Sequence, residues 1–229
     1  MDVNADFRRP ASLHTQDMPW VPSPMPGVER RMLDRMGGEV ARATSIVRYA
    51  PGSAFSAHTH TGGEEYLVLE GVFQDEHGDF PAGTYVRNPP TSSHTPRADD
   101  GATILVKLWQ FDMKDRQQLS VDTTIADPVA IAPGVSEIPL YADNRERVRI
   151  EVWDAHTKVN VSQHKGFEAL VLEGSFSFED QTYKAHSWLR LPPDYAFEGT
   201  AGELGARLWI KSDHLGEPQL APEDRDLST

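Results

Sequence analysis

The sequence predicts an all-β protein built from two copies of one unit. Glycine and proline number 17 each in 229 residues and are spread between short apolar runs, which is the pattern of many strands and tight turns. Several of these runs alternate apolar and polar residues, as half-buried strands do. Only residues 113–119 suggest a short helical turn.

The duplication is visible as two series of strand-like segments in the same order. In the first half, EYLVLEG (65–71) precedes GTYVRNPP (83–90) and ILVKLWQ (104–110). In the second half the corresponding segments are EALVLEG (168–174), HSWLRLPP (186–193) and LGARLWI (204–210). The constant separation of roughly 100 residues indicates an internal repeat of one all-β unit.

Charge and composition exclude several classes of protein. The formal net charge is −13, from 35 acidic and 22 basic side chains, so a phosphate backbone would be repelled and nucleic acid is not an expected partner. Cysteine is absent, which excludes disulfides and thiolate metal sites. No apolar run reaches the length of about 18 residues that would cross a membrane, and the N-terminus lacks an apolar signal core. We expect a cytoplasmic protein without a membrane partner.

A histidine cluster is the strongest chemical signal in the sequence. His58 and His60 are two apart, so on a strand they point to the same face. A glycine-rich reversal could then return Glu64 opposite them, and His94 follows a later strand. Three imidazoles and a carboxylate are a typical ligand set for a divalent first-row metal. The alternative is a group of solvated loop residues. The competing carboxylate is Glu65, which alternation sends to the opposite face.

These residues resemble the cupin family. Its first motif is Gly, five residues, His-x-His, three residues, Glu, six residues, Gly, and it maps onto Gly52, His58, His60, Glu64 and Gly71 with every spacing intact.

The second cupin motif is matched less completely. It fits Gly83, Pro89 and His94, but Thr91 stands where the family has glycine and Ala98 where it has asparagine. Neither departure affects an expected metal ligand.

Residues 58–94 are similar in particular to the cupin-like domain of ChrR, an anti-sigma factor that responds to singlet oxygen. The resemblance implies zinc ligation by two histidines, a glutamate and a third histidine. Related cupins with this signature are acetylacetone-type dioxygenases. ChrR binds its sigma factor through a separate helical zinc domain with cysteines. Because this chain has no cysteine and no amphipathic helical region before residue 38, we do not expect anti-sigma activity by that route.

The second copy has lost most of the ligand set. In the segment before the second LVLEG, we take Ser162 as the counterpart of His58, and His164 and Glu168 as the counterparts of His60 and, approximately, Glu64. Aligning the double prolines places Phe197 at the position of His94. We therefore expect a second barrel without metal, in which His164 and Glu168 could form a hydrogen-bonded pair and Phe197 fills the interior.

Some neighbouring residues have simpler interpretations. We expect His77, Asp75, Glu76 and Asp79 to form a solvated acidic hairpin turn. Strand parity suggests that four residues line the first barrel, where a lysine would indicate an anionic ligand; these are Tyr66, Val68, Tyr85 and Lys107.

The resemblance and the repeat together imply a bicupin, two tandem antiparallel jelly-roll barrels. The expected organisation is an irregular lead-in (1–37), a first barrel with the metal site (38–119), a linker (120–145), a second barrel with a degenerate site (146–215) and a tail (216–229).

The implied function is a metal-dependent small-molecule enzyme, dioxygenase-like, acting on a diketone or enol. It would hold one divalent transition metal (Zn, or Fe, Mn or Ni) through His58, His60, Glu64 and His94, with Glu64 as the candidate catalytic residue. The alternative is a non-enzymatic zinc-binding module in oxidative-stress regulation. The expected partners are a small molecule in the first barrel and, as one candidate assembly, a second copy of the chain.

Overall fold

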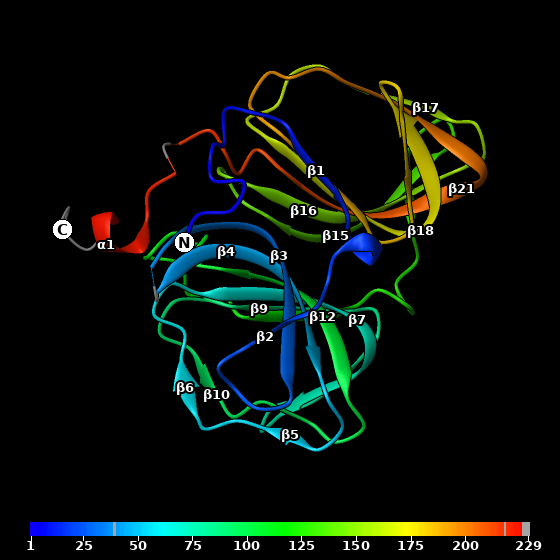
Figure 1. The fold of residues 1–229 in the computed structure, drawn as a ribbon. Helices are drawn as coiled ribbons and strands as arrows, with labels where there is room; N and C mark the ends of the chain where they lie inside the picture. The colour runs from blue at the N-terminus through cyan, green and yellow to red at the C-terminus, as the bar shows by residue number, and fades with distance from the viewer. Residues whose placement is uncertain (39, 218, 226–229) are drawn as a thin grey trace. The chain divides into compact units, whose positions relative to one another are not determined.

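The computed structural model describes residues 1–38, 40–217 and 219–225 (Figure 1). Its residues group into two compact units. The first consists mainly of Pro19–Thr124, and the second of Asp6–Met18 with Ile125–Gln219. Both are built almost entirely from antiparallel strands, so the prediction of an all-β fold from two similar units is confirmed.

The first unit contains a ten-stranded sheet and a small separate pair of strands. The main path runs β13-β9-β7-β12-β4-β3-β2, with β5, β8 and β11 attached beside it, and β6 pairs with β10. The strands are β2 (Val21–Pro22), β3 (Val28–Gly37), β4 (Ala41–Tyr49), β5 (Ser53–Ala54), β6 (His58–Thr59), β7 (Glu64–Asp75), β8 (Gly78–Pro81), β9 (Thr84–Asn88), β10 (Ser93–His94), β11 (Arg97–Ala98), β12 (Ala102–Leu108) and β13 (Leu119–Asp122).

The second unit repeats this arrangement in a nine-stranded sheet. Its main path runs β1-β20-β18-β21-β16-β15-β14, with β17 and β19 attached. The strands are β1 (Ala11–His14), β14 (Val129–Ala132), β15 (Val135–Ala142), β16 (Arg147–Trp153), β17 (Lys158–Val161), β18 (Phe167–Phe178), β19 (Gln181–Lys184), β20 (Ser187–Leu191) and β21 (Phe197–Ser212). The helical elements of the described chain are a 3₁₀ turn, η1 (Thr15–Asp17), and α1 (Pro222–Arg225). No described helix is both long and apolar enough to cross a lipid bilayer.

The segments expected to be an irregular lead-in and a linker contain strands. Residues 1–37 include β1, β2 and β3, and residues 120–145 include β14, β15 and most of β13. Two strands pair with the half of the sequence to which they do not belong. β1, near the start of the chain, pairs with β20 of the second unit, and β13, which precedes the second half, pairs with β9 of the first unit. This pairing joins segments that are distant in sequence, so local patterns do not reveal it.

Strand alternation separates an inner from an outer face in each unit. On β7, Tyr66 and Val68 belong to the apolar core with Phe73, whereas Glu65 and Leu67 face the other way. The inward positions are even-numbered up to Val68 and odd-numbered from Phe73, because the pairing with β12 shifts by one residue between Val68 and Glu70. The second unit has a larger aromatic core that includes Trp153.

Two equivalent glycines permit the closest backbone approaches in the sheets. Gly71 and Gly174 have φ values of +72° and +70°. A Cβ atom at either position would overlap a carbonyl oxygen, that of Gly101 in the first unit and that of Gly205 in the second. The same local geometry therefore occurs in both repeats.

We expect Gly71→Ala and Gly174→Ala each to lower the free energy of unfolding by about 2–5 kcal/mol, because left-handed backbone strain and steric overlap both add cost. The control is Gly52→Ala, where φ is +78° but no atom lies within 4 Å of the new Cβ. Its cost should be about 1–2 kcal/mol. Urea unfolding followed by circular dichroism measures the three values. A loss in Gly71→Ala no larger than that in Gly52→Ala would contradict the close approach.

Candidate metal centre

The backbone brings His58 and His94 together before any side-chain interaction is considered. The two-residue strands β6 and β10 lie side by side (Figure 1) and pair antiparallel, with His58 directly opposite His94. His60 follows β6, and its carbonyl accepts a hydrogen bond from the Thr91 amide at 2.9 Å. Thr91 has φ +75°, a conformation that glycine adopts more readily, and this is the position where the cupin motif has glycine.

A tight reversal returns the chain from His60 to Glu64 at the start of β7. Gly63 has φ +77°, and a Cβ atom on it would lie 2.5 Å from the ring of Phe111. A Cβ atom on Gly62 would overlap the indole of Trp109. Both glycines are therefore needed because aromatic rings pack directly against the backbone of the turn.

The three histidine side chains converge on one point. Their ring centroids are 4.9 Å apart for His58 and His60, 4.9 Å for His58 and His94, and 4.6 Å for His60 and His94. One ring nitrogen from each lies within 4.8 Å of the others. His60 and His94 are buried and His58 is exposed. This cluster could hold a metal ion.

Glu64 lies beside two of the rings. Its Oε2 atom is 3.4 Å from Nε2 of His60 and 3.7 Å from Nε2 of His94. Asn88 donates a hydrogen bond from Nδ2 to the same oxygen at 3.3 Å. The competing carboxylate, Glu65, is on the opposite face, where it accepts a hydrogen bond from the Tyr85 hydroxyl at 2.6 Å. Glu64 is thus the carboxylate that the fold places at the cluster.

His60 and His94 have different electrostatic environments. Burial lowers the pKa of His60, and the neighbouring His94 and His58 lower it further. The charge of Glu64 raises this pKa but does not outweigh these effects. The Nε2 atom of His60 is buried without a hydrogen-bond partner. Burial also lowers the pKa of His94, but the hydrogen bond to Asp75 and the charges of Glu64 and Asp75 outweigh it, so that pKa is raised.

An unpartnered nitrogen on a neutral, buried imidazole is suited to ligate a cation. With the nearby carboxylate of Glu64, the donor set fits a divalent first-row metal.

Asp75 is a residue of this site that sequence reasoning missed. It was expected in a solvated acidic turn, but it is 5% exposed and its Oδ2 atom is 3.0 Å from Nδ1 of His94. Burial raises the pKa of Asp75, but its hydrogen bonds with His94 and the His77 amide lower it more. An ionised Asp75 makes His94 donate from Nδ1, which leaves Nε2 free toward the cluster. The available signal was the repeat itself, in which the equivalent residue is Phe178.

The wall beside the cluster is aromatic. The Phe73 ring is 6.3 Å from that of His94, 5.1 Å from that of Tyr66 and 5.2 Å from that of Tyr49. Tyr66 is 1% exposed, and its hydroxyl has no hydrogen-bond partner. Burial raises the pKa of Tyr66, and the charges of Glu64 and Asp75 raise it further, so the hydroxyl stays protonated.

The expected barrel lining is half correct. Tyr66 and Val68 belong to the inner core. Tyr85 pairs with Leu67 and Lys107 pairs with Glu65, so both lie on the outer face. Lys107 donates a hydrogen bond to Thr44 Oγ1 at 2.8 Å. It therefore does not indicate an anionic ligand in the interior.

The second unit presents different residues at the equivalent backbone positions. Val161 lies opposite Phe197 just as His58 lies opposite His94. Phe167 begins β18 as Glu64 begins β7. The expected equivalence of Ser162 to His58 is therefore wrong by one residue, and Glu168 corresponds to Glu65 rather than to Glu64.

His164 does occupy the backbone position of His60, because its carbonyl accepts a hydrogen bond from Asp194 as that of His60 does from Thr91. It does not pair with Glu168. Its Nε2 lies 2.8 Å from the Tyr195 carbonyl oxygen and its Nδ1 accepts from the Gly166 amide. Glu168 instead accepts from Trp188 and lies 3.0 Å from His214.

Phe197 fills the interior of the second unit as expected, with 0% exposure and its ring stacked on Phe167 at 4.8 Å. Among the described residues, the histidine cluster of the first unit is the only group of three or more potential ligands close enough to share an ion.

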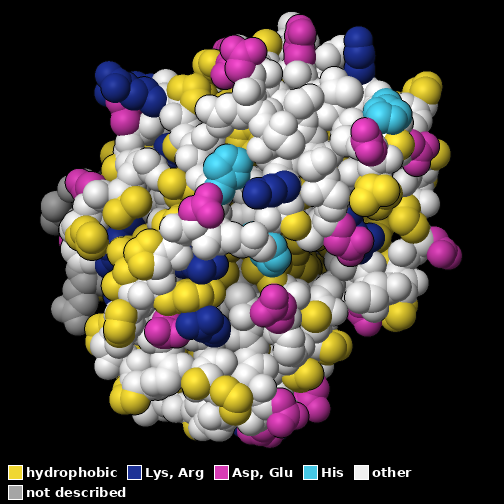
Figure 2. All heavy atoms as spheres, turned by 45° about the vertical axis from the view of Figure 1, so that its right-hand side comes forward, with side chains coloured by type: hydrophobic (Ala, Val, Ile, Leu, Met, Phe, Trp, Pro, Cys, Tyr) yellow, Lys and Arg dark blue, Asp and Glu magenta, His cyan; other side chains and the backbone are white. Residues whose placement is uncertain are grey.

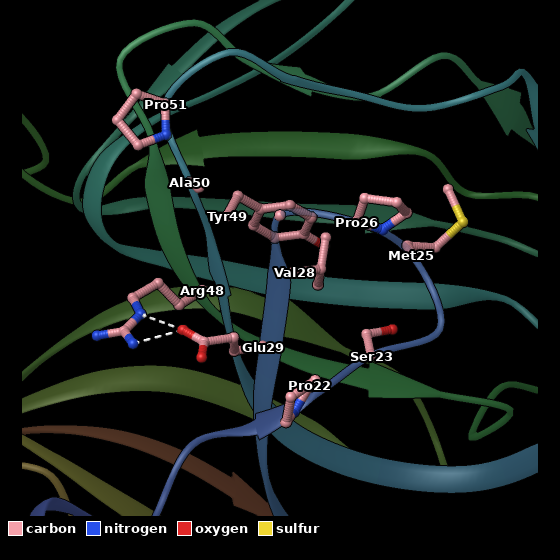
Figure 3. A pocket seen from close by; sticks show the side chains of 11 residues that line it. Pro22, Ser23, Met25, Pro26, Val28, Glu29, Arg48, Tyr49, Ala50 and Pro51 are labelled. Atoms are coloured by element: carbon pink, nitrogen blue, oxygen red, sulfur yellow. Dashed lines mark hydrogen bonds and ion pairs between the residues drawn. The ribbon is translucent and has the colours of Figure 1, made fainter.

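A surface pocket of about 510 Å³ in the first unit is separate from the histidine cluster. Figure 3 shows Tyr49 and Val28 at this pocket, with the ion pair of Arg48 and Glu29 beside them. None of its lining residues is a member of the cluster. Charged side chains of both signs are interspersed over the face in Figure 2 and form no continuous basic patch there.

Comparisons with known proteins agree with this architecture. A family model of the ChrR cupin-like domain matches residues 8–112. A search of curated protein sequences found no match.

Solved structures share the fold over most of the chain. A candidate dioxygenase from Nostoc punctiforme aligns with a TM-score of 0.77 at 14% identity, covering 93% of this chain and 86% of that one. The pirin YhhW from Escherichia coli, in complex with nickel(II), aligns with a TM-score of 0.64 at 11% identity, covering 89% and 98%. Salicylate 1,2-dioxygenase from Pseudaminobacter salicylatoxidans gives 0.57 at 12% identity, covering 75% and 70%.

At these identities the structural likeness shows the fold alone. The chain therefore has the bicupin fold of these solved structures, and its residues 8–112 match the family model of the ChrR cupin-like domain.

Proposed function

We propose that the protein is a metal-dependent small-molecule enzyme, dioxygenase-like, whose single divalent ion is held by His58, His60, Glu64 and His94. The observation that carries the proposal is the asymmetric burial of the cluster. Two of its imidazoles are buried, but the His58 ring is exposed, so the cluster can be reached from solvent. Four protein ligands would fill the coordination shell of a structural zinc ion, but they would leave positions open on an ion that takes six ligands, such as Fe(II), Mn(II) or Ni(II).

The proposed substrate class is a diketone or an enol. When bound, the ion would supply a Lewis acid and a template for a substrate with adjacent oxygens. The chain's own residues would hold and orient this arrangement. Asp75 fixes the tautomer of His94, and the aromatic wall of Tyr66 and Phe73 excludes water. Glu64 is the candidate acceptor for a proton lost by the substrate, because its carboxylate lies next to the rings and has a second oxygen besides the one nearest to them.

The structural relatives support this class of chemistry without fixing the metal. One solved relative is a salicylate 1,2-dioxygenase and another is a pirin with nickel(II). The alternative function is a zinc-binding regulatory module, which the match of residues 8–112 to the ChrR cupin-like domain favours. In that case a redox-silent zinc would stabilise the domain and no turnover would occur.

The two functions give different results with protein purified without added metal. For the enzyme we expect iron, manganese or nickel by elemental analysis, and oxygen consumption when acetylacetone is added to the iron- or manganese-loaded protein. Tightly held zinc with no oxygen uptake after exchange into iron(II) would contradict the enzyme and favour the module.

The ligand set is tested by a pair of histidine variants. His94→Ala should lower the bound metal from one ion per chain to near zero, because it removes a buried nitrogen and leaves Asp75 without its partner. His164→Ala, the control in the second unit, should retain the full amount. Equal metal contents in the two variants would rule out the proposed site.

Asp75 should act through His94 on metal affinity. Asp75→Asn removes the charge that orients the imidazole, so we expect the dissociation constant for Zn(II) to rise about 10- to 100-fold. Competition with a chromophoric chelator measures it. The control is Asp79→Asn in the same hairpin, where the side chain is 66% exposed and affinity should not change. If Asp75→Asn and Asp79→Asn bind zinc equally well, Asp75 has no role at the site.

A further inference from the structure

The two units allow their interiors to be compared position by position. Strands β7 and β18 both have 12 residues and nearly the same burial pattern, so each residue of one has a counterpart in the other. Glu64 corresponds to Phe167, Tyr66 to Ala169 and Asp75 to Phe178. The unit with the histidine cluster therefore has two further inward polar groups that the second unit replaces with apolar side chains. Asp75 is accounted for by its hydrogen bond with His94. Tyr66 is not accounted for.

The Tyr66 hydroxyl is an unusual group to find inside a barrel. The side chain is 1% exposed, and its oxygen has no hydrogen-bond partner in the structure. A buried hydroxyl without a partner is unfavourable, and phenylalanine would fill the same space without this cost. The ring already packs on two phenylalanines, at 5.1 Å from Phe73 and 6.2 Å from Phe80. Packing thus explains the ring but not the oxygen.

The position of Tyr66 on β7 directs it toward the cluster. Residues two apart on a strand share a face, so Tyr66 lies on the same inner face as Glu64, one step further along the strand. Its ring contacts Phe73, and the Phe73 ring in turn lies 6.3 Å from that of His94. A small molecule that binds beside the histidines would therefore lie against this aromatic wall.

We propose that the Tyr66 hydroxyl donates a hydrogen bond to an oxygen of the small molecule that binds beside the three histidines. This inference rests on the proposed function and narrows it. A hydrogen-bond donor at this place favours a ligand with an electron-rich oxygen at its metal-facing end, such as an enolate. An apolar ligand of the same shape would bind more weakly. Tyr66 is then a ligand-contacting residue whose hydroxyl is satisfied only in the complex.

The test uses the full chain loaded with Co(II), whose visible absorption changes when its ligands change. Two probes are titrated, acetylacetone as the diketone and azide as a simple anion that can occupy an open coordination position. In Tyr66→Phe we expect the dissociation constant of each probe to rise about 10- to 100-fold, the range for a lost hydrogen bond to a charged acceptor. The cobalt content should remain that of the wild type.

The matched control is Tyr85→Phe on the neighbouring strand, where the hydroxyl has a protein partner, Glu65, on the outer face. Tyr85→Phe should leave both probe affinities unchanged but unfold at a lower urea concentration, because Glu65 loses a donor. Tyr66→Phe without probe should unfold at the same or a higher urea concentration than wild type, because no protein hydrogen bond is lost. A destabilised Tyr66→Phe with unchanged probe affinity would assign the hydroxyl a structural role and overturn the proposal.

The outcomes separate this inference from the proposed function. In one outcome the wild type binds azide but not acetylacetone, and azide binding weakens in Tyr66→Phe. The role of Tyr66 then stands, and the diketone function fails. If both probes bind wild type and Tyr66→Phe equally, the diketone class survives and the role of Tyr66 fails. If neither probe binds the cobalt-loaded wild type, the site has no open position, and both are overturned in favour of the zinc module.

Discussion

The pairing of two very short strands is the constraint on which the candidate metal centre depends. β6 and β10 contribute only two residues each, yet their register sets His58 directly opposite His94. The turn through Gly62 and Gly63 then fixes where Glu64 starts β7. Since aromatic rings lie against both glycines, this turn is supported by the packing of Trp109 and Phe111. The candidate ligands are thus placed by backbone pairing and by outer packing, neither of which requires a metal.

The second unit shows which side chains fill the interior of the same fold in the absence of a histidine cluster. Its interior has stacked rings where the first unit has His94, Glu64 and Asp75, with Phe197 4.8 Å from Phe167 and 5.0 Å from Phe178. The fold therefore accepts apolar side chains at these three positions. Burying polar groups in a core is unfavourable unless they have partners. Because this fold can bury apolar side chains at these positions, the polar side chains in the first unit are better explained by function than by stability.

Sequence reasoning succeeded where spacing alone determines geometry and failed where register does. The His-x-His spacing and the repeat were sufficient to identify the cluster and the duplicated all-β fold. Matching His164 to His60 placed Ser162 and Glu168 one residue away from the true counterparts of His58 and Glu64. Two residues, not one, separate Val161 from His164, and two, not three, separate His164 from Phe167.

Parity arguments failed for a related reason. Tyr85 and Lys107 were assigned to the interior, but their faces are set by pairing with Leu67 and Glu65, which a single strand does not encode. Asp75 turns inward because the register of β7 shifts between Val68 and Glu70. At these residues, strand pairing across the sheet determines which face a side chain occupies, and the alternation within one strand does not.

The charges at the site restrict how a substrate could bind there. The carboxyl groups of Glu64 and Asp75 both lie at the cluster, so as carboxylates they would balance the two positive charges of a divalent ion bound there. A ligand that arrives already ionised would add an uncompensated negative charge, and Lys107, which could have balanced it, lies on the outer face. A neutral diketone avoids this cost if the proton that it loses remains on the Glu64 carboxyl group, because the net charge of the site is then unchanged. The Tyr66 hydroxyl would stabilise the oxygen on which the remaining negative charge develops. The proposed substrate is therefore best described as a weak carbon or enol acid that ionises only after it is bound.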